Sequence, residues 1–321
     1  MDGLLNISVA LCTCNGARFL SEQLVSLAEQ TLRPIELVVC DDASDDGTWQ
    51  ILEEFQRSAP FAVRLYRNVR RLGIAQNFEQ AMLLCEGDVI ALCDQDDVWL
   101  PEKLMLFSRQ FMDGADAVCC DARIANAKLV PLGYTLWDRV TFTDSQRRVA
   151  SNGHLLEVLL KHYVIAGATL AFRTELRNCL LPIPPNWLYD AWLAAMLAAN
   201  GKLCIVDACL QLYRQHENNA VGGHRQSILR QLQGALNTSR AEYLNLEISR
   251  WEQFRERLVS NETSSHTMQQ VEEKLRHLQR RARFPSNRLL RAPYLLSEIF
   301  RGGYSQYSRN WGSIALDLLL K

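Results

Sequence analysis

Three aspartates stand together directly after an apolar segment. Residues 90–93 are Ile, Ala, Leu and Cys, and Asp94, Asp96 and Asp97 follow before Pro101 begins a predicted helix. Carboxylates held this close raise one another's pKa and reduce stability unless a cation neutralises them, and oxygen donors of this kind suit Mg²⁺ or Mn²⁺. An acidic helix cap would account for one aspartate but not for three. The cluster therefore predicts a metal site at the end of a strand.

The first part of the chain alternates between apolar strand-like and amphipathic helical segments. We expect strands at 6–12, 35–40, 62–66 and 88–93, and helices between them at 17–30, 45–55 and 76–84. This repeat predicts an α/β fold with a mostly parallel sheet flanked by helices. Ligands of such sheets bind beyond the carboxyl ends of the strands. The polar residues at these ends are Thr13, Asn15, Asp41, Asp42 and the three clustered aspartates, and we expect them to converge on one crevice.

Composition excludes several classes of protein. With 48% hydrophobic and 22% charged residues among 321, the chain lies in the globular range. Glu157, Lys161 and His162 interrupt the most apolar segment, 154–172, which favours a buried core over a membrane span. The first residues carry no basic cluster, so we expect no secretory signal. None of the ten cysteines forms a CxxC pair, which favours reduced thiols in a cytoplasmic protein.

Charge is divided unevenly along the chain. Residues 1–224 carry a net charge of −8 and residues 225–321 one of +7. Within 274–309, nine Lys and Arg residues accompany one acid, Glu298, and five Phe and Tyr residues. Such a segment suits anionic lipid headgroups or a phosphate-bearing acceptor; alternatively, its arginines pair with the acidic first domain or with another subunit. No recognised nucleic-acid-binding motif accompanies it, so we expect no nucleic-acid partner.

Two domains are expected, at 1–223 and 224–321. The first carries the strand–helix alternation, and the second is a basic helical extension that contacts a membrane, an acceptor or another subunit. The long amphipathic helices predicted in the second are 226–257 and 267–283, with Pro285 and Pro293 expected to break the pattern.

Several motifs, in order, resemble a known family. Residues 8–16, with Leu20, Gln23 and Ser26 behind them, are similar to the opening motif of the family 2 inverting glycosyltransferases of GT-A fold. The resemblance covers roughly residues 5–220, and several motifs in the right order are far more specific than a lone Asp-x-Asp. The other matching segments are 30–31, 36–48, 73–78, 94–99 and 213–219. The last two of these look most like the rhamnosyltransferase-like branch of the family, which builds lipopolysaccharide and other bacterial surface polysaccharides.

The resemblance implies that a nucleotide-sugar binds at the strand ends. Asp42 would accept a hydrogen bond from N3–H of a uracil or thymine, because a carboxylate is a strong acceptor for such a donor. Asp94 would face the ribose, while Asp41 would contact the ribose or cap a helix. Asp121 is a weaker candidate for contacts with the donor sugar. The nucleotide-sugar-binding residues implied in this way are Thr13, Asn15, Asp41, Asp42, Asp94 and Asp121.

The resemblance also implies a metal site and a general base. Asp96 would ligate Mg²⁺ or Mn²⁺ bridging the donor diphosphate, and His216 would be a further metal or phosphate ligand; without the residues beside it, His216 would read as an ordinary loop histidine. Asp190 matches the base that takes the proton of the acceptor hydroxyl, and it could at the same time cap the Ala-rich helix that follows. The residues expected on the acceptor side are His162, Tyr163 and Trp192.

The sequence is therefore interpreted as a metal-dependent inverting glycosyltransferase. It would move a sugar, with rhamnose from a dTDP donor as the first choice, onto a lipid-linked or polysaccharide acceptor, as a cytoplasmic protein held peripherally at the inner face of the cytoplasmic membrane. A nucleotidyltransferase is a rival interpretation, but residues 13–16 lack the lysine that a triphosphate-binding loop needs. A second rival is a non-catalytic GT-A-like scaffold, against which the joint presence of Asp42, Asp96, Asp190 and His216 argues.

Overall fold

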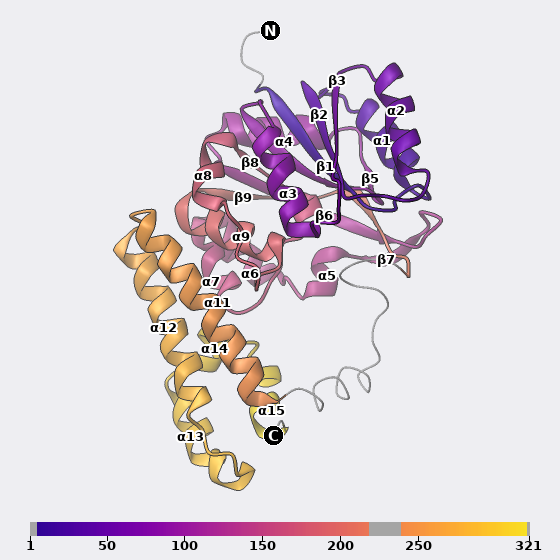
Figure 1. Cartoon of the computed structure of the whole chain (residues 1–321). Helices are drawn as coiled ribbons and strands as arrows, with labels where there is room; N and C mark the ends of the chain where they lie inside the picture. The colour runs from indigo at the N-terminus through magenta and orange to yellow at the C-terminus, as the bar shows by residue number, and fades with distance from the viewer. Residues whose placement is uncertain (1–4, 218–238, 320–321) are drawn as a thin grey trace. The chain divides into compact units, whose positions relative to one another are not determined.

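A computed structural model describes residues 5–217 and 239–319 of the chain (Figure 1). These residues form two compact units: residues 5–153 with 164–216, and residues 154–163 with 217 and 239–319. We call them the sheet unit and the helical unit. Asn218 and Asn219, which belong to the last motif of the family resemblance, lie outside the described residues.

The sheet unit is built on one mixed sheet. Strands β3, β2, β1 and β4 pair in parallel, which confirms the parallel sheet predicted from the strand–helix repeat. Beyond β4 the pairing becomes mixed: β8 is antiparallel to β4 and β6, β9 is parallel to β6, and β5 and β7 pair antiparallel with β9 and β6. The order is β3(Ala62–Arg67), β2(Glu36–Asp41), β1(Ile7–Thr13), β4(Val89–Asp94), β8(Leu170–Arg173), β6(Ala117–Ala125), β9(Leu203–Arg214) and β5(Val98–Trp99), with β7(Pro131–Thr135) beside β6.

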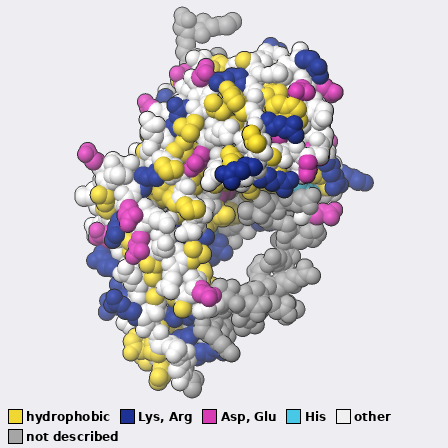
Figure 2. Space-filling view, viewed as in Figure 1, with side chains coloured by type: hydrophobic (Ala, Val, Ile, Leu, Met, Phe, Trp, Pro, Cys, Tyr) yellow, Lys and Arg dark blue, Asp and Glu magenta, His cyan; other side chains and the backbone are white. Residues whose placement is uncertain are grey.

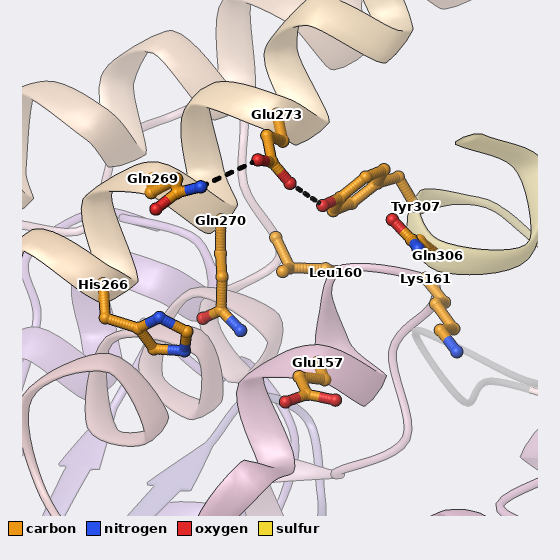
Figure 3. Close-up of a pocket in the computed structure, with 9 residues that line it drawn as sticks. All are labelled: Glu157, Leu160, Lys161, His266, Gln269, Gln270, Glu273, Gln306 and Tyr307. Atoms are coloured by element: carbon orange, nitrogen blue, oxygen red, sulfur yellow. Dashed lines mark hydrogen bonds between the residues drawn. The ribbon is translucent and has the colours of Figure 1, made fainter. Parts of the chain in front are cut away.

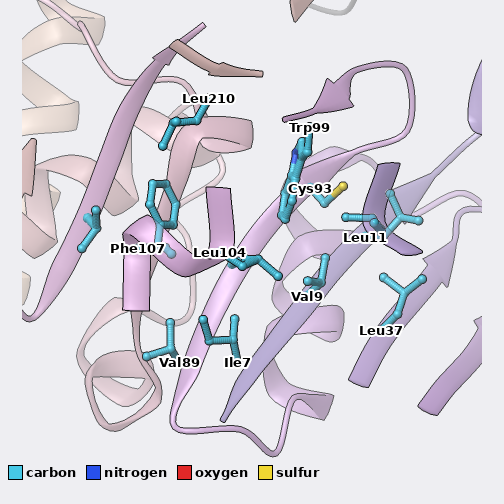
Figure 4. Close-up of a cluster of buried hydrophobic side chains, with 14 of the residues drawn as sticks. Ile7, Val9, Leu11, Leu37, Val89, Cys93, Trp99, Leu104, Phe107 and Leu210 are labelled. Atoms are coloured by element: carbon cyan, nitrogen blue, oxygen red, sulfur yellow. The ribbon is translucent and has the colours of Figure 1, made fainter. Parts of the chain in front are cut away.

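Helices cover both faces of this sheet. The main hydrophobic cluster packs alternate residues of β1, among them Val9 and Leu11, against Leu104 and Phe107 of α4 (Figure 4). Helices α1 and α2 add to the same cluster, whereas α3 contacts β1 and β2 without contributing to it. Because both faces are covered, the central strands are buried along almost their whole length. The helices of this unit are α1(Leu20–Ala28), α2(Thr48–Ser58), α3(Ile74–Leu84), α4(Lys103–Met112), α5(Leu136–Val140), α6(Asp144–Val149), α8(Arg177–Leu180) and α9(Tyr189–Asn200), with short turns η2(Gly167–Thr169) and η3(Thr174–Leu176).

The helical unit confirms the helical extension predicted from the sequence. Pro293 lies inside α13 and does not end it, contrary to the expectation. The side chain of Pro293 is on the exposed side of the helix, where water can bond the carbonyl that loses its N–H partner. Within the described residues, no helix is both long enough and apolar enough to cross a membrane. The helices are α7(Leu155–Leu159), α11(Arg240–Ser260), α12(Ser265–Ala282), α13(Arg288–Phe300), α14(Gly303–Tyr307) and α15(Trp311–Leu319).

Much of the basic segment is used inside the helical unit itself. Arg281 Nε donates to Asp317 Oδ2 at 2.6 Å, and Arg240 Nε donates to Asp317 Oδ1 at 2.9 Å. Arg280 Nε donates to Glu298 Oε2 at 2.7 Å and Arg280 Nη2 to Glu298 Oε1 at 2.9 Å. Arg280 and Arg281 of the basic segment therefore have carboxylate partners within the helical unit. The basic side chains of 274–309 that are at most 4% exposed are Lys274, Arg281 and Arg291.

Candidate active site

The loops after β1 and β2 are joined through the buried carboxylate of Asp41. Its Oδ1 accepts from Thr13 Oγ1 at 2.8 Å and from Ser44 Oγ at 2.5 Å, and its Oδ2 accepts from Ser44 N at 3.0 Å. Asn15 links the same two loops, since its N–H donates to Ser44 Oγ at 2.8 Å and its Oδ1 accepts from Asp45 N at 3.0 Å. Asp41 is fully buried. Through these bonds, Thr13, Asn15 and Asp41 fix the loop after β1 against the loop after β2.

Asp42 is oriented by the loop that leads into α3. Its Oδ1 accepts from Asn68 Nδ2 at 2.9 Å and from Leu72 N at 2.7 Å, and its Oδ2 accepts from Gly73 N at 2.9 Å. Gly73 has φ of 88°, a conformation that glycine adopts without strain and that aims its N–H at the carboxylate. A carboxylate offers about four lone pairs. Three donors therefore leave Oδ2 one further acceptor position, which a ligand N–H can use.

Gln95 joins the end of β4 to the loop after β1. Its Oε1 accepts from Cys14 N at 2.9 Å and its Nε2 donates to Cys14 O at 3.1 Å. A Cβ on Gly16 would lie 2.1 Å from Gln95 Oε1, so a larger residue there would displace the Gln95 side chain. Sequence reasoning did not single out Gln95, although it stands inside the acidic motif. Its two bonds fix the relative position of two strand ends.

Asp94 and Asp190 come from β4 and α9, far apart in the chain, and lie within electrostatic reach of each other. Burial raises the pKa of Asp94 to about 7, and the charges of Asp96 and Asp190 add to the rise. Burial likewise raises the pKa of Asp190. Asp190 Oδ1 accepts from Ala191 N at 2.8 Å, and the N-cap of α9 is Leu188, so Asp190 is a first-turn residue and not the cap. Asp94 and Asp190 thus both have a pKa displaced toward the neutral form, and the charge of Asp96 adds to the effect on Asp94.

Tyr189 connects these carboxylates to the rest of the sheet unit. Its hydroxyl donates to Asp94 Oδ1 at 3.5 Å, and its ring stacks on Phe78 with centroids 4.4 Å apart. A Cβ on Gly167 would come within 2.1 Å of the Tyr189 hydroxyl, so glycine makes room for the ring. Sequence reasoning named the segment around Asp190 but missed Tyr189. The available signal was the aromatic residue next to a proposed base.

His216 brings the end of β9 to Asp96. His216 Nε2 lies 2.7 Å from Asp96 Oδ2, and the imidazole packs against the ring of Phe19 with centroids 4.7 Å apart. Arg214, which the sequence analysis did not assign a role, is only 1% exposed and donates from Nε to Asp96 O at 2.6 Å. Arg214 therefore positions the backbone that carries Asp96.

Asp97 differs from its two neighbours in the acidic motif. It is 1% exposed, and its oxygens accept from Gln211 Nε2 at 2.9 Å and from Arg214 N at 3.0 Å. Gln211 in turn accepts from Lys103 Nζ at 2.6 Å, in a site where burial lowers the pKa of the lysine. The third carboxylate is thus part of a buried polar network, which accounts for its presence without a metal.

Asp96 and His216 provide one oxygen and one nitrogen donor for a metal. Among the residues that the structure describes, no group of three or more His, Cys, Asp or Glu side chains is arranged to hold a metal ion. Mg²⁺ at phosphate sites is usually bound by one or two protein side chains, with phosphate oxygens and water completing the coordination. The donor set at the Asp96–His216 pair therefore fits a metal shared with a diphosphate, rather than one held by the protein alone.

The remaining predicted residues lie in different surroundings. Asp121 is 7% exposed, and its Oδ1 accepts from Ala122 N at 2.7 Å and from Trp137 N at 3.0 Å, at the start of α5. Trp192 is fully buried and donates from Nε1 to Leu180 O at 2.7 Å, so an acceptor could reach it only after a rearrangement. The two predicted acceptor-side residues that belong to the helical unit, both partly exposed, are His162 and Tyr163.

A separate hollow of about 300 Å³ lies in the helical unit, between residues of α7, α12 and α14 (Figure 3). Tyr307 donates to Glu273 Oε2 at 2.5 Å, and Gln269 Nε2 donates to Glu273 Oε1 at 3.1 Å along its wall. None of the predicted site residues lines this hollow. We identify the candidate active site by the carboxylates Asp94 and Asp190, whose pKa values are raised, because they lie with the strand-end residues and not in the hollow.

The chain is similar in sequence to several known proteins. Residues 8–180 match the model of the family described as Glycosyl transferase family 2. The chain is 28% identical over 226 residues to dTDP-rhamnosyl transferase RfbG of Shigella flexneri, in an alignment that covers 67% of this chain and 74% of that protein. It is 26% identical over 174 residues to abequosyltransferase RfbV of Salmonella typhimurium, covering 53% of this chain and 51% of the relative.

Solved structures share the fold. TarS of S. aureus, in complex with UDP-GlcNAc, matches with a TM-score of 0.56 and 19% identity over 98% of this chain and 84% of that chain. Mannosyltransferase PcManGT from Pyrobaculum calidifontis, in complex with GDP-Man and Mn²⁺, matches with a TM-score of 0.57 and 18% identity over 98% of this chain and 85% of that chain. The GT-A-like fold expected from the sequence is confirmed.

Proposed function

Because this chain belongs to glycosyl transferase family 2, we propose that its strand-end carboxylates bind a nucleotide-sugar and transfer the sugar with inversion. Rhamnose from a dTDP donor is the assignment we propose first, since RfbG, named as a dTDP-rhamnosyl transferase, aligns with 67% of the chain. The proposed acceptor is a lipid-linked or polysaccharide glycan of a bacterial surface, reached by a peripheral protein at the inner face of the cytoplasmic membrane.

The proposal for the donor rests on the acceptor position left on Asp42. Three donors hold this carboxylate in place, and the free position on Oδ2 suits the N3–H of thymine or uracil. Asp94, the last residue of β4, would face the ribose. Thr13 and Asn15 would act through the loop that they hold, not through contacts of their own side chains with the sugar.

The observation that carries the proposal is the grouping of Asp94, Asp96 and Asp190. Burial that raises the pKa of Asp190 also makes its carboxylate a stronger base, which is what removal of a proton from an acceptor hydroxyl requires. Attack by that hydroxyl on the anomeric carbon, as the nucleoside diphosphate leaves from the opposite side, inverts the configuration. The Tyr189 hydroxyl orients the carboxylate of Asp94, and the Ala191 N–H orients that of Asp190.

Asp96 and His216 would hold Mg²⁺ or Mn²⁺ together with the donor diphosphate. When bound, the metal would supply positive charge that stabilises the leaving diphosphate. The chain's own residues do the positioning: Arg214 fixes the backbone of Asp96, and Phe19 supports the imidazole of His216.

A donor panel tests the proposed function. Nucleotide release is measured with dTDP-rhamnose, UDP-sugars and GDP-sugars, with and without EDTA, and donor binding is followed independently by the rise in melting temperature. We expect stabilisation and release with a dTDP-sugar, both dependent on a divalent cation. Binding without release for every donor, in the presence of candidate acceptors, would instead support the non-catalytic scaffold.

A further inference from the structure

Helix α13 is attached to the helical unit by one narrow stripe of residues. Arg291, Leu295 and Glu298 are 1%, 3% and 2% exposed, and their spacing of four and three residues places them on one side of the helix. Leu295 joins a small hydrophobic cluster with Phe284, Tyr304 and Ile314. The anchoring side of α13 is thus polar at both ends and apolar at its centre.

The opposite side of α13 is apolar and exposed. Leu296 is 54% exposed and Phe300 88%, and Leu290, one turn or more before them, is 58% exposed; Ile299, 37% exposed, lies on the flank. At about 100° per residue, Leu296, Phe300 and Pro293 project away from the anchoring stripe. Figure 2 shows hydrophobic side chains gathered over α13 at the lower end of the view. A contiguous apolar face of this kind marks an interaction surface.

The exposed charged side chains of residues 283–319 are of one sign. Arg283, Arg288 and Arg301 are exposed. The acids among residues 283–319 are Glu298 and Asp317, which are 2% and 1% exposed and bonded to arginines. No described residue of this segment therefore presents an exposed carboxylate to a partner.

We infer that α13 lies in the headgroup region of an anionic bilayer, with Leu296 and Phe300 directed into the acyl chains and Arg288 and Arg301 at the phosphates. A helix with an exposed apolar side and an exposed arginine at each end, Arg288 and Arg301, about 20 Å long at 1.5 Å per residue, suits a position in the plane of the interface. A symmetric contact with a second copy would instead bring the same exposed arginines together. The inference rests on the proposed function only for the expectation that the enzyme works at a membrane.

The experiment uses the full chain and vesicles of phosphatidylcholine with and without phosphatidylglycerol. We expect cosedimentation with the anionic vesicles and a fall of about tenfold or more in the partition coefficient for the double variant Leu296→Ser/Phe300→Ser. The control is Val259→Ser on α11, since Val259 is 63% exposed but lies outside this face. Arg288→Gln/Arg301→Gln should lower binding at low salt and have little effect at high salt.

The outcomes separate this inference from the proposed function. Equal vesicle binding by the full chain and the Leu296→Ser/Phe300→Ser variant, or no binding by the full chain, overturns the inference even where donor release is normal. A concentration-dependent dimer that the same variant abolishes would assign the face to a second copy and also overturn it. Melting temperature verifies folding; should the double variant unfold, Phe300→Ser alone replaces it, because a side chain 88% exposed contributes little to the fold.

Discussion

Two groups of carboxylates, one in each unit, differ in the direction in which the fold shifts their pKa. In the sheet unit, Asp94 lies near Asp96 and Asp190, and its pKa is raised to about 7 by burial and by their charges. In the helical unit, hydrogen bonds from His277 and Arg280 outweigh burial and lower the pKa of Glu298 to about 2. One arrangement opposes ionisation, and the other favours it.

Hydrogen-bond donors account for the contrast. Asp317 accepts from Arg240 and Arg281 and from the Tyr304 hydroxyl at 2.6 Å, and the two arginines lower its pKa against the effect of burial. Asp94 receives a long bond of 3.5 Å from Tyr189. A carboxylate surrounded by donors stabilises the fold, whereas one placed beside other carboxylates is stabilised only when a proton or a cation arrives. The comparison therefore separates residues kept for chemistry from residues kept for structure.

The strongest test of this separation is Asp96→Ala. Loss of the oxygen donor beside His216 removes one of two proposed metal ligands, so we expect kcat/KM to fall by about 10³ or more and donor binding to lose its dependence on divalent cations. Turnover and nucleotide binding are measured while the metal is titrated. An Asp96→Ala enzyme with undiminished rate, or a wild type indifferent to EDTA, would refute the metal assignment.

The next test is Asp190→Asn, which keeps the shape of the side chain but cannot accept a proton. We expect kcat to fall by a factor on the order of 10² with donor binding nearly unchanged, as for loss of a positioned base. Asp113→Asn, at an exposed carboxylate after α4, serves as the control and should leave kcat unchanged. A change confined to KM would make Asp190 a binding residue.

In the helical unit the matching substitution, Asp317→Asn, is predicted to affect stability. It leaves Arg240 and Arg281 buried without their carboxylate, so we expect the free energy of unfolding to fall by about 3 kcal/mol. Denaturant unfolding measures the change, and Glu256→Gln on the exposed surface of α11 is the control. An unchanged midpoint would show that the buried ion pairs do not hold this unit together.

The sequence predicted the parallel half of the sheet because each strand there is followed by its own helix. Periodicity and strand-end polarity located β1 to β4 and placed Asp42 and Asp94 at their ends. The antiparallel pairing of β8 with β4 and β6 could not be read in this way, since it joins segments about 50 to 80 residues apart without a local pattern. Likewise, nothing in the sequence distinguished Asp97, which is bonded to Gln211 of a distant strand, from Asp96.

Residues that position the site were harder to predict than residues that would do its chemistry. Gln95, Tyr189 and Arg214 stand beside predicted site residues, yet their roles depend on partners that only the fold supplies, such as Cys14 for Gln95. Charge composition likewise located the basic segment, but it could not show which of its arginine side chains are buried. The buried carboxylates Glu298 and Asp317 decide that.

The smallest predicted effect is on the pH dependence of stability, which has opposite signs for Asp94 in the sheet unit and Glu298 in the helical unit. Because the pKa of Asp94 in the folded chain is about 7 and that of an unfolded Asp about 3.9, the folded chain binds more protons between these values, and the contribution of Asp94 to stability decreases as pH rises from about 4 to 7. Glu298 behaves in the opposite way. Its pKa is lowered to about 2, so its contribution is present above about pH 4.5 and is lost as pH falls toward 2.

We therefore expect Asp94→Asn to stabilise the chain, whereas Asp317→Asn destabilises it. Above pH 7 the wild type must ionise Asp94 beside Asp96 and Asp190, while the amide stays neutral. Since Asp94 is partly exposed and the amide alters the bond from Tyr189, we expect a gain of about 1 kcal/mol at pH 8 that disappears near pH 4. Unfolding free energies of both variants and the wild type, measured across this range, check the prediction. A loss of stability at pH 8 would mean that Asp94, like Asp317, is held in its charged form by the fold, and the contrast between the two units would then fail at its central residue.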